Sequence, residues 1–130
     1  MEFQHCTLAY GDNERGRCTW CGDPLPPRRR RFCSASCSSD FGVNHYWPNA
    51  RLGALARAAY ACEDPYCSVS EATGRIEVHH LAAPVGGRRR YAMGCHNHQD
   101  RLLVLCDGHH MNETRWERAN GRPVQLQLIA

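Results

Sequence analysis

The chain has 130 residues, a formal net charge of +3 and 42% hydrophobic residues, so it can form one modest core or two very small ones. Domains of this size need covalent or metal cross-links, which nine cysteines and eight histidines could supply. No apolar run approaches the roughly 18 residues that span a bilayer, so we expect no membrane partner.

Zinc ions and disulfide bonds are the two explanations for so many cysteines. The odd cysteine count, the histidines beside cysteines and the lack of an apolar segment behind a basic region near the N-terminus favour zinc. We therefore expect a reduced, cytoplasmic protein. A disulfide-rich secreted domain is the alternative, and it predicts loss of the fold under reductant and insensitivity to chelators.

All 16 basic residues are arginines, whose planar guanidinium groups bind phosphate through two parallel hydrogen bonds. A GC-rich genome also explains the absence of lysine, so the positions of the arginines tell more than their number. Two runs predict contacts with the phosphates of a nucleic acid, with simple solvation of the charges as the alternative. These runs are Arg28, Arg29, Arg30 and Arg31, and Arg88, Arg89 and Arg90.

Residues 1–45 contain the first set of closely spaced cysteines. Cys18 and Cys21 form a C-x2-C turn followed by a glycine, and Cys33 and Cys37 form a C-x3-C pair. A serine at the second pair can cap a short helix that carries Cys37. Four cysteines in this order predict a treble-clef or ribbon-like finger around a structural zinc ion, with disulfide bonds as the alternative. The adjacent pair His5 and Cys6 is expected to lie in a disordered terminus.

Residues 46–119 begin with an expected helix from about Pro48 to a point before Cys62. Its apolar stripe has the spacing of one helical face and consists of Leu52, Leu55, Ala56, Ala59 and Tyr60. Trp47 and Trp116 are expected to be core aromatic residues.

Two strands and a helix are expected next. Residues 75–81 alternate apolar and polar side chains, which predicts a strand with Ile76, Val78 and His80 on one face and Glu77, His79 and Leu81 on the other. After a long loop, residues 102–105 predict a second apolar strand and residues 109–119 a helix. Residues 120–130 are expected to form a tail or edge strand.

The order strand, loop, strand, helix, with histidines ending the first strand and beginning the helix, resembles the ββα-metal fold of the HNH endonucleases. The resemblance covers residues 46–119 and is carried by Tyr60, Ala61, Cys62, Cys67, Glu77, Val78, His79, His80, Leu81, Gly86, Gly87, Leu102, Leu103, Val104, Leu105, Cys106, His109, His110 and Thr114. The four-cysteine finger is similar to accessory fingers that precede HNH domains in some bacterial and phage proteins. The expected fold class is therefore a small, zinc-stabilised α+β protein, a zinc knuckle followed by a ββα-metal domain.

The resemblance implies a metal-dependent endonuclease that hydrolyses phosphodiester bonds in duplex DNA, by nicking or by double-strand cleavage. His79 and His110 would hold an exchangeable Mg²⁺, Mn²⁺ or Ni²⁺ ion, and His80 would act as the general base. Since one such site attacks one strand, family analogy implies a homodimer or larger nucleoprotein complex for cutting both. The expected setting is the cytoplasm of a bacterium or of a phage-infected bacterial host.

A second structural zinc site is expected beside the catalytic one. Cys62 and Cys67 precede the first strand, while Cys106 and His109 follow the second strand with the spacing C-x2-H. Three cysteines and one histidine suit a closed zinc site that stabilises the fold. The alternative is that His109 binds the catalytic metal.

Two features depart from the family pattern. Arg101 stands where the family has its middle asparagine, and Asn97 lies four residues earlier. Either Asn97 orients the site, or Arg101 replaces it by gripping phosphate. Thr114 follows His110 by one helical turn and is a poor candidate for a third helical ligand.

The loop sequence Cys95-His96-Asn97-His98 could form an extra metal site, but a Cys-x-His pattern without partners favours a role other than metal binding. For the whole chain, the alternative function is a non-catalytic two-zinc nucleic-acid-binding or adaptor module. The presence of His79, His80 and His110 argues against it, because an inactive module needs no convergent imidazoles.

Overall fold

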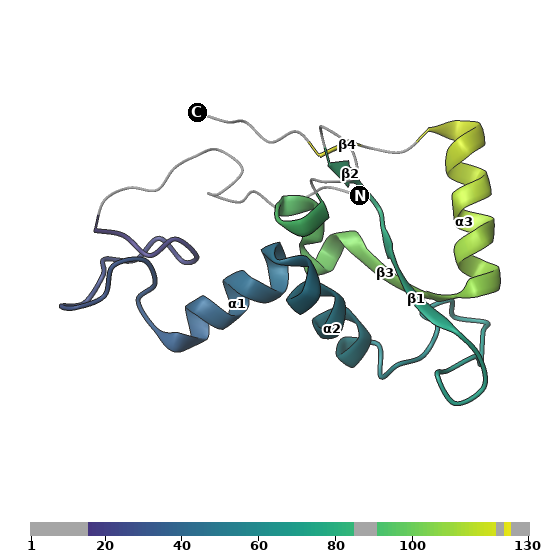
Figure 1. The fold of residues 1–130 in the computed structure, drawn as a ribbon, viewed down its shortest axis with the longest axis horizontal. Helices are drawn as coiled ribbons and strands as arrows, with labels where there is room; N and C mark the ends of the chain where they lie inside the picture. Colours follow the sequence, from purple (N-terminus) through teal and green to yellow (C-terminus); the bar gives the residue numbers. More distant parts are fainter. Residues whose placement is uncertain (1–15, 85–90, 122–123, 126–130) are drawn as a thin grey trace.

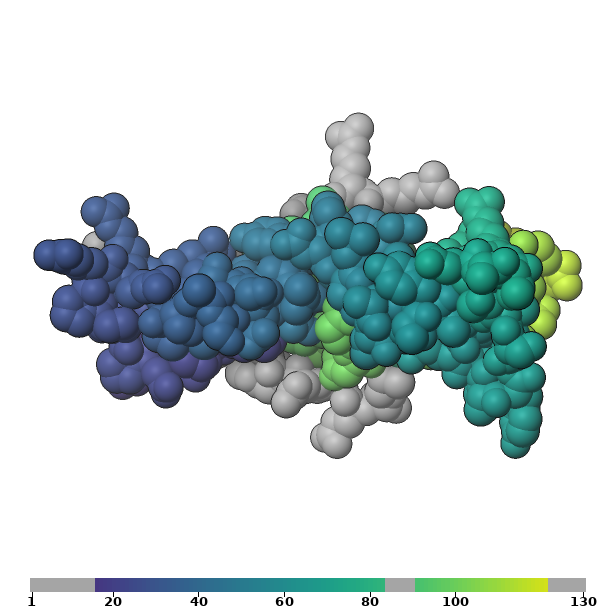
Figure 2. Space-filling model, turned by 90° about the horizontal axis from the view of Figure 1, so that it is seen from below, coloured from purple at the N-terminus to yellow at the C-terminus, as the bar shows by residue number. Residues whose placement is uncertain are grey.

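A computed structural model of the chain describes residues 16–84, 91–121 and 124–125. Figure 1 shows a small α+β fold with the cysteine-rich segment at one end, helices α1 (Ala35–His45) and α2 (Trp47–Arg57) along the middle, and helix α3 (Asp107–Asn120) at the other end. Figure 2 shows the same lengthwise order from purple to yellow. In the described segments, no helix has the length and apolar character needed to cross a membrane.

Strands β1 (Ile76–His80) and β3 (Leu102–Cys106) pair in antiparallel fashion at both places where the sequence predicts strands. The register sets Ile76 opposite Cys106 and His80 opposite Leu102. In Figure 1 this pair lies between α2 and α3. Consecutive side chains of β1 therefore face α2 and α3 in turn.

A second, very short pairing joins the end of the chain to the segment after β1. Strand β2 (Ala83–Pro84) runs parallel to strand β4 (Val124–Gln125). The predicted tail strand thus has two residues in the described part of the chain. The rest of the predicted edge strand lies outside the described residues.

The main core forms where α2 packs on the strand pair. Its buried members are Ala50, Ala54, Leu55, Leu102 and Val104, and the partly buried Ile76 and Val78 pack against them. The prediction that Ile76 and Val78 share one face of β1 is therefore confirmed.

The predicted apolar stripe of α2 is only partly correct. Leu55 is buried, but Leu52 is 56% exposed, because the buried face instead follows the small residues Ala50 and Ala54 at one-turn spacing. The helix also ends earlier than expected, at Arg57. Ala59 and Tyr60 have positive φ values of 53° and 56°, which end the helical conformation before Cys62.

Helix α1 begins as expected at Ser34, whose hydroxyl oxygen accepts a 3.1 Å hydrogen bond from the Cys37 N–H. The helix is longer than expected, however, because it has 11 residues and continues to His45. Phe41 and His45 in its second half are completely buried. The helix that carries Cys37 therefore also contributes to the interior of the rest of the fold.

The Arg57 guanidinium at the end of α2 holds three neighbouring segments. It donates to the backbone oxygen of Gln99 at 2.7 Å, to that of Leu102 at 3.1 Å and to the Glu63 carboxylate at 2.8 Å. Glu63 also accepts a 2.8 Å hydrogen bond from the backbone N–H of Val104. These bonds link α2 to the edge of β3.

Helix α3 has no buried residue. A partly buried face meets the strand pair and consists of His109, His110, Glu113, Thr114 and Glu117. Trp116 lies off this face and is 60% exposed, so its expected core position is wrong. The helix is held to the strands by polar groups, and these form the sites described next.

Candidate metal centres

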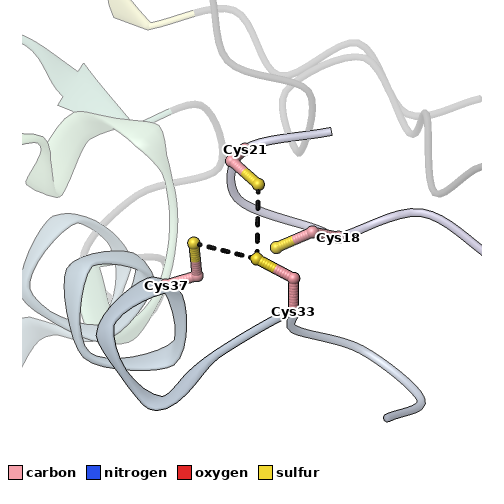
Figure 3. Close-up of side chains that lie close together, drawn as sticks. All are labelled: Cys18, Cys21, Cys33 and Cys37. Atoms are coloured by element: carbon pink, nitrogen blue, oxygen red, sulfur yellow. Dashed lines mark hydrogen bonds between the residues drawn. The ribbon is translucent and has the colours of Figure 1, made fainter. Parts of the chain in front are cut away.

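The four cysteines of the finger converge as the spacing predicts. Cys18, Cys21, Cys33 and Cys37 bring their sulfur atoms within 4.8 Å of one another, and Figure 3 shows the sulfurs pointing inward. The Sγ atoms of Cys21 and Cys33 are 3.5 Å apart, as are those of Cys33 and Cys37. Gly22 closes the first turn with a φ of 79°, a conformation that favours glycine. The set can hold a metal ion.

The turn around Cys18 also favours the thiolate that a metal ion needs. Burial raises the pKa of the Cys18 thiol, but hydrogen bonds from the backbone at Cys21, Cys33 and Trp20 outweigh burial and lower it to about 6. Hydrogen bonds with Ser34 and Cys33 lower the pKa of the Cys37 thiol, but burial and the Cys21 and Cys18 thiols outweigh them and raise it.

The second predicted set, Cys62, Cys67, Cys106 and His109, also comes together. Its first two cysteines precede β1 in the chain, Cys106 ends β3, and His109 lies in α3. The Nδ1 atom of His109 is 3.1 Å from the Cys106 sulfur and 3.5 Å from the Cys62 sulfur, and the Cys67 sulfur is 4.0 Å from that of Cys106. The opposite ring nitrogen of His109 lies 3.6 Å from a carboxylate oxygen of Asp64. A ligand imidazole typically has such a carboxylate on its other nitrogen. This set, too, can hold a metal ion.

A pocket lies between β1 and α3, lined by His79, His110, Thr114, Glu117 and Arg118. Nε2 of His79 is 2.6 Å from a carboxylate oxygen of Glu117, and the rings of His79 and His110 have centroids 5.0 Å apart. The structure therefore brings together the two histidines that the sequence analysis assigns to the catalytic metal.

The carboxylate of Glu77 orients His110. Nδ1 of His110 pairs with Glu77, and this hydrogen bond lowers the pKa of the Glu77 carboxyl. With Nδ1 engaged, the other ring nitrogen of His110 is the one available to a ligand.

The carboxylates of Glu113 and Glu117, which were not predicted as site residues, lie beside His79. Ligand atoms of His79, Glu113 and Glu117 all lie within 4.8 Å of one another. Glu113 and Glu117 follow His110 by three and seven residues, which is the spacing of one helical face. That spacing is the only signal in the sequence that could have identified them.

His80 points to the other side of the strand pair, as strand alternation predicts. Its side chain is 8% exposed, packs against the rings of Trp47 and Tyr91, and places Nε2 2.8 Å from Oδ1 of Asn97. The amide nitrogen of Asn97 donates 2.9 Å hydrogen bonds to the backbone oxygens of His45 and Tyr91. Because two carbonyl oxygens fix the amide nitrogen, the amide oxygen must face His80.

The sequence leaves open whether Asn97 orients the site or Arg101 replaces it by gripping phosphate, and the geometry favours Asn97. The Arg101 side chain is 2% exposed and donates a 2.8 Å hydrogen bond to the backbone oxygen of Cys95. A side chain this deeply buried is not placed to grip the phosphate of a DNA backbone.

The predicted phosphate-binding arginines are described only in part. Arg28, Arg29, Arg30 and Arg31 are exposed at the finger, where the Arg31 guanidinium also lies 5.0 Å from the centre of the Phe41 ring. The second run, Arg88 to Arg90, lies outside the described residues, as do Gly86, Gly87, His5 and Cys6.

A search with protein-family models found no matching family, and comparisons with curated proteins and with solved structures found no match either. The resemblance to the HNH endonucleases therefore stays a prediction.

Proposed function

We propose that this chain is a metal-dependent DNA endonuclease of the HNH type. The observation that carries the proposal is the convergence of His79 from β1 with His110 and Glu117 from α3 on one pocket. The exposed Arg118 lines the same pocket and could contact a phosphate. Imidazoles, carboxylates and a guanidinium together suit phosphodiester hydrolysis better than a purely structural site.

The donor set of the pocket fits a divalent ion such as Mg²⁺, Mn²⁺ or Ni²⁺. His79 would hold this ion together with the carboxylates of Glu113 and Glu117, whose oxygens suit hard cations. His110, which lines the same pocket, would provide a second imidazole. A metal ion bound there supplies a positive charge for the scissile phosphate and the leaving oxygen. The carboxylate of Glu77 would keep the His110 ring turned toward the ion.

His80 is the proposed general base. The amide oxygen of Asn97 can only accept a hydrogen bond, so a neutral His80 carries its proton on Nε2 and its lone pair on Nδ1. Asn97 thereby selects the tautomer whose Nδ1 lone pair is the one that a general base would use. Through this hydrogen bond, Asn97 would orient the site, which is one of the two roles that the sequence leaves open.

The finger would bind the DNA backbone. The finger, which carries the exposed Arg28, Arg29 and Arg30, lies at the end of the molecule opposite the yellow α3 (Figure 2). Contacts at the finger and at the pocket would therefore involve separate parts of the duplex. The two cysteine-rich sets would hold structural zinc and keep the finger and α3 in place.

A second candidate function is a non-catalytic nucleic-acid-binding module. The observation in its favour is the 8% exposure of His80, whose ring is enclosed by Trp47 and Tyr91. Such a module would bind DNA through the arginines without cleaving it.

Plasmid nicking in the presence of Mg²⁺ or Mn²⁺ tests the proposal. We expect the native chain to convert supercoiled DNA to the nicked form, and His80→Ala to lower the rate by at least about 100-fold, the usual contribution of a general base. Glu117→Gln should lower the rate as well, because it removes a carboxylate from the pocket.

Glu71→Gln is the matched control, since Glu71 is an exposed carboxylate in a turn outside the pocket. It should nick at the native rate. If the native chain and all three variants bind DNA equally and none cleaves it with any of the metals, the binding module is the correct function.

A further inference from the structure

A third cluster of metal-binding side chains lies between the end of α1 and the 3₁₀ turn η3 (Cys95–Asn97). Ligand atoms of His45, Cys95 and His98 all lie within 4.8 Å of one another. His45 and Cys95 have no exposed surface and His98 is 5% exposed. None of the three belongs to the two cysteine-rich sets or to the pocket.

The two imidazoles meet through their Nε2 atoms, which are 3.1 Å apart. Nδ1 of His45 lies 2.8 Å from the backbone oxygen of Phe41, within the same helix. A carbonyl oxygen can only accept, so the proton of a neutral His45 is on Nδ1 and its Nε2 lone pair points toward His98. A backbone carbonyl on the distal nitrogen is the usual arrangement for a metal-bound histidine.

The Cys95 thiol lies beside the two imidazoles. Two imidazoles and one thiol form a borderline-soft donor set that suits Zn²⁺ better than Mg²⁺ or Ca²⁺.

We propose that His45, Cys95 and His98 form a third metal site that binds Zn²⁺ through two imidazole nitrogens and one thiolate. Zinc binding would displace the thiol proton of Cys95 to solvent. A tetrahedral ion takes four ligands, so one position is left for a donor that these three side chains do not provide.

The site would position the loop that carries Asn97. Two donors of this loop, the backbone N–H of Gly94 and the amide nitrogen of Asn97, bind the backbone oxygen of His45 at 3.0 Å and 2.9 Å. The ion would also connect His45, at the end of α1, to Cys95 and His98, which flank Asn97. It would therefore hold the amide that orients His80. This role rests on the proposed nuclease function, whereas the metal site itself does not.

Zinc content measured by mass spectrometry on the full chain tests the site. All proteins would carry Glu117→Gln, so that an ion in the pocket does not contribute, and would be purified under reductant and passed over a desalting column. We expect three zinc ions per chain in this parent protein and the loss of one ion in the double variant Cys95→Ser/His98→Asn. Met93→Ser is the matched control in the same loop, 40% exposed, and should keep the parent content.

Equal zinc content in the parent and the double variant would overturn the proposal. If the double variant does not fold, X-ray absorption at the zinc edge of the parent decides. The proposal predicts eight thiolates shared among three ions, whereas seven thiolates shared between two ions would refute it. Zinc content is measured without DNA, so failure of the nicking assay would leave this result unaffected.

Discussion

Asn97 shows how a single side chain can connect distant parts of this fold. It has no exposed surface, and its amide group contacts the backbone oxygens of His45 and Tyr91 and the imidazole of His80. These partners come from the end of α1, the loop and the end of β1. The residue therefore matters for stability as well as for its proposed role in orienting His80.

Replacing Asn97 by alanine should lower the free energy of unfolding by about 2 kcal/mol, because buried hydrogen-bonding groups lose their partner. Urea denaturation of the zinc-loaded protein measures this change. Asn120→Ala is the control, since Asn120 is exposed and bonds only within its own helix in the described structure. It should change the free energy by no more than about 0.5 kcal/mol. Equal destabilisation by the two substitutions would contradict the assigned contacts.

The residues of the candidate sites were predictable where the chain itself fixes their geometry. Strand alternation places His79 and His80 on opposite faces, and the C-x2-C and C-x2-H spacings bring ligands together across tight turns. Glu113 and Glu117 could not be selected, because solvated carboxylates are common on a polar helix. His45 lies 50 residues before Cys95, and only the packing of α1 against η3 brings the two together.

At the scale of the elements, α2 is joined to β3 by both apolar and polar contacts. Ala54 and Leu55 pack against Leu102 and Val104, while Arg57 reaches the backbone at the start of the strand. The sequence predicts the helix but not its orientation, because the stripe of larger residues does not match the buried face. Small alanine side chains allow the close approach that the core requires.

Arg57→Ala should destabilise the protein by about 1.5 kcal/mol, since it removes hydrogen bonds from a charged donor to Gln99, Leu102 and Glu63. Arg51→Ala provides a matched comparison, because Arg51 is an exposed arginine of the same helix. It should have an effect within about 0.5 kcal/mol. The midpoint of urea unfolding distinguishes the two variants. A shift of the same size in both would show that the Arg57 bonds add nothing to stability.

The apolar core of the molecule is small, so we expect metal ions in the cysteine-rich sets to contribute much of its stability. The main core has five buried residues, and α3 has no buried residue at all. An apolar core of this size offsets little of the chain entropy that folding removes. The finger set lies outside this core, whereas two cysteines of the second set, Cys62 and Cys106, form a small buried cluster with Leu105.

Removing zinc with a strong chelator under reducing conditions should therefore abolish the near-ultraviolet circular dichroism of the folded protein. Without the ions, the cysteines would have no common centre to bind and would no longer hold the finger or α3. Adding Zn²⁺ should restore the signal, whereas adding Mg²⁺ should not. A protein that keeps its signal after complete zinc removal would show that the core is sufficient by itself.

Helix α1 begins beside one cysteine-rich set and ends inside the body of the protein. Cys37 lies in its first turn, and His45 at its last residue is buried against the loop at Cys95 and His98. A cut at the end of this helix would remove the buried Phe41 and His45 from the interior of the remainder. The finger is therefore not a portable module: a chimera that exchanges it for another finger must keep the second half of α1, or rebuild the interior that this half fills.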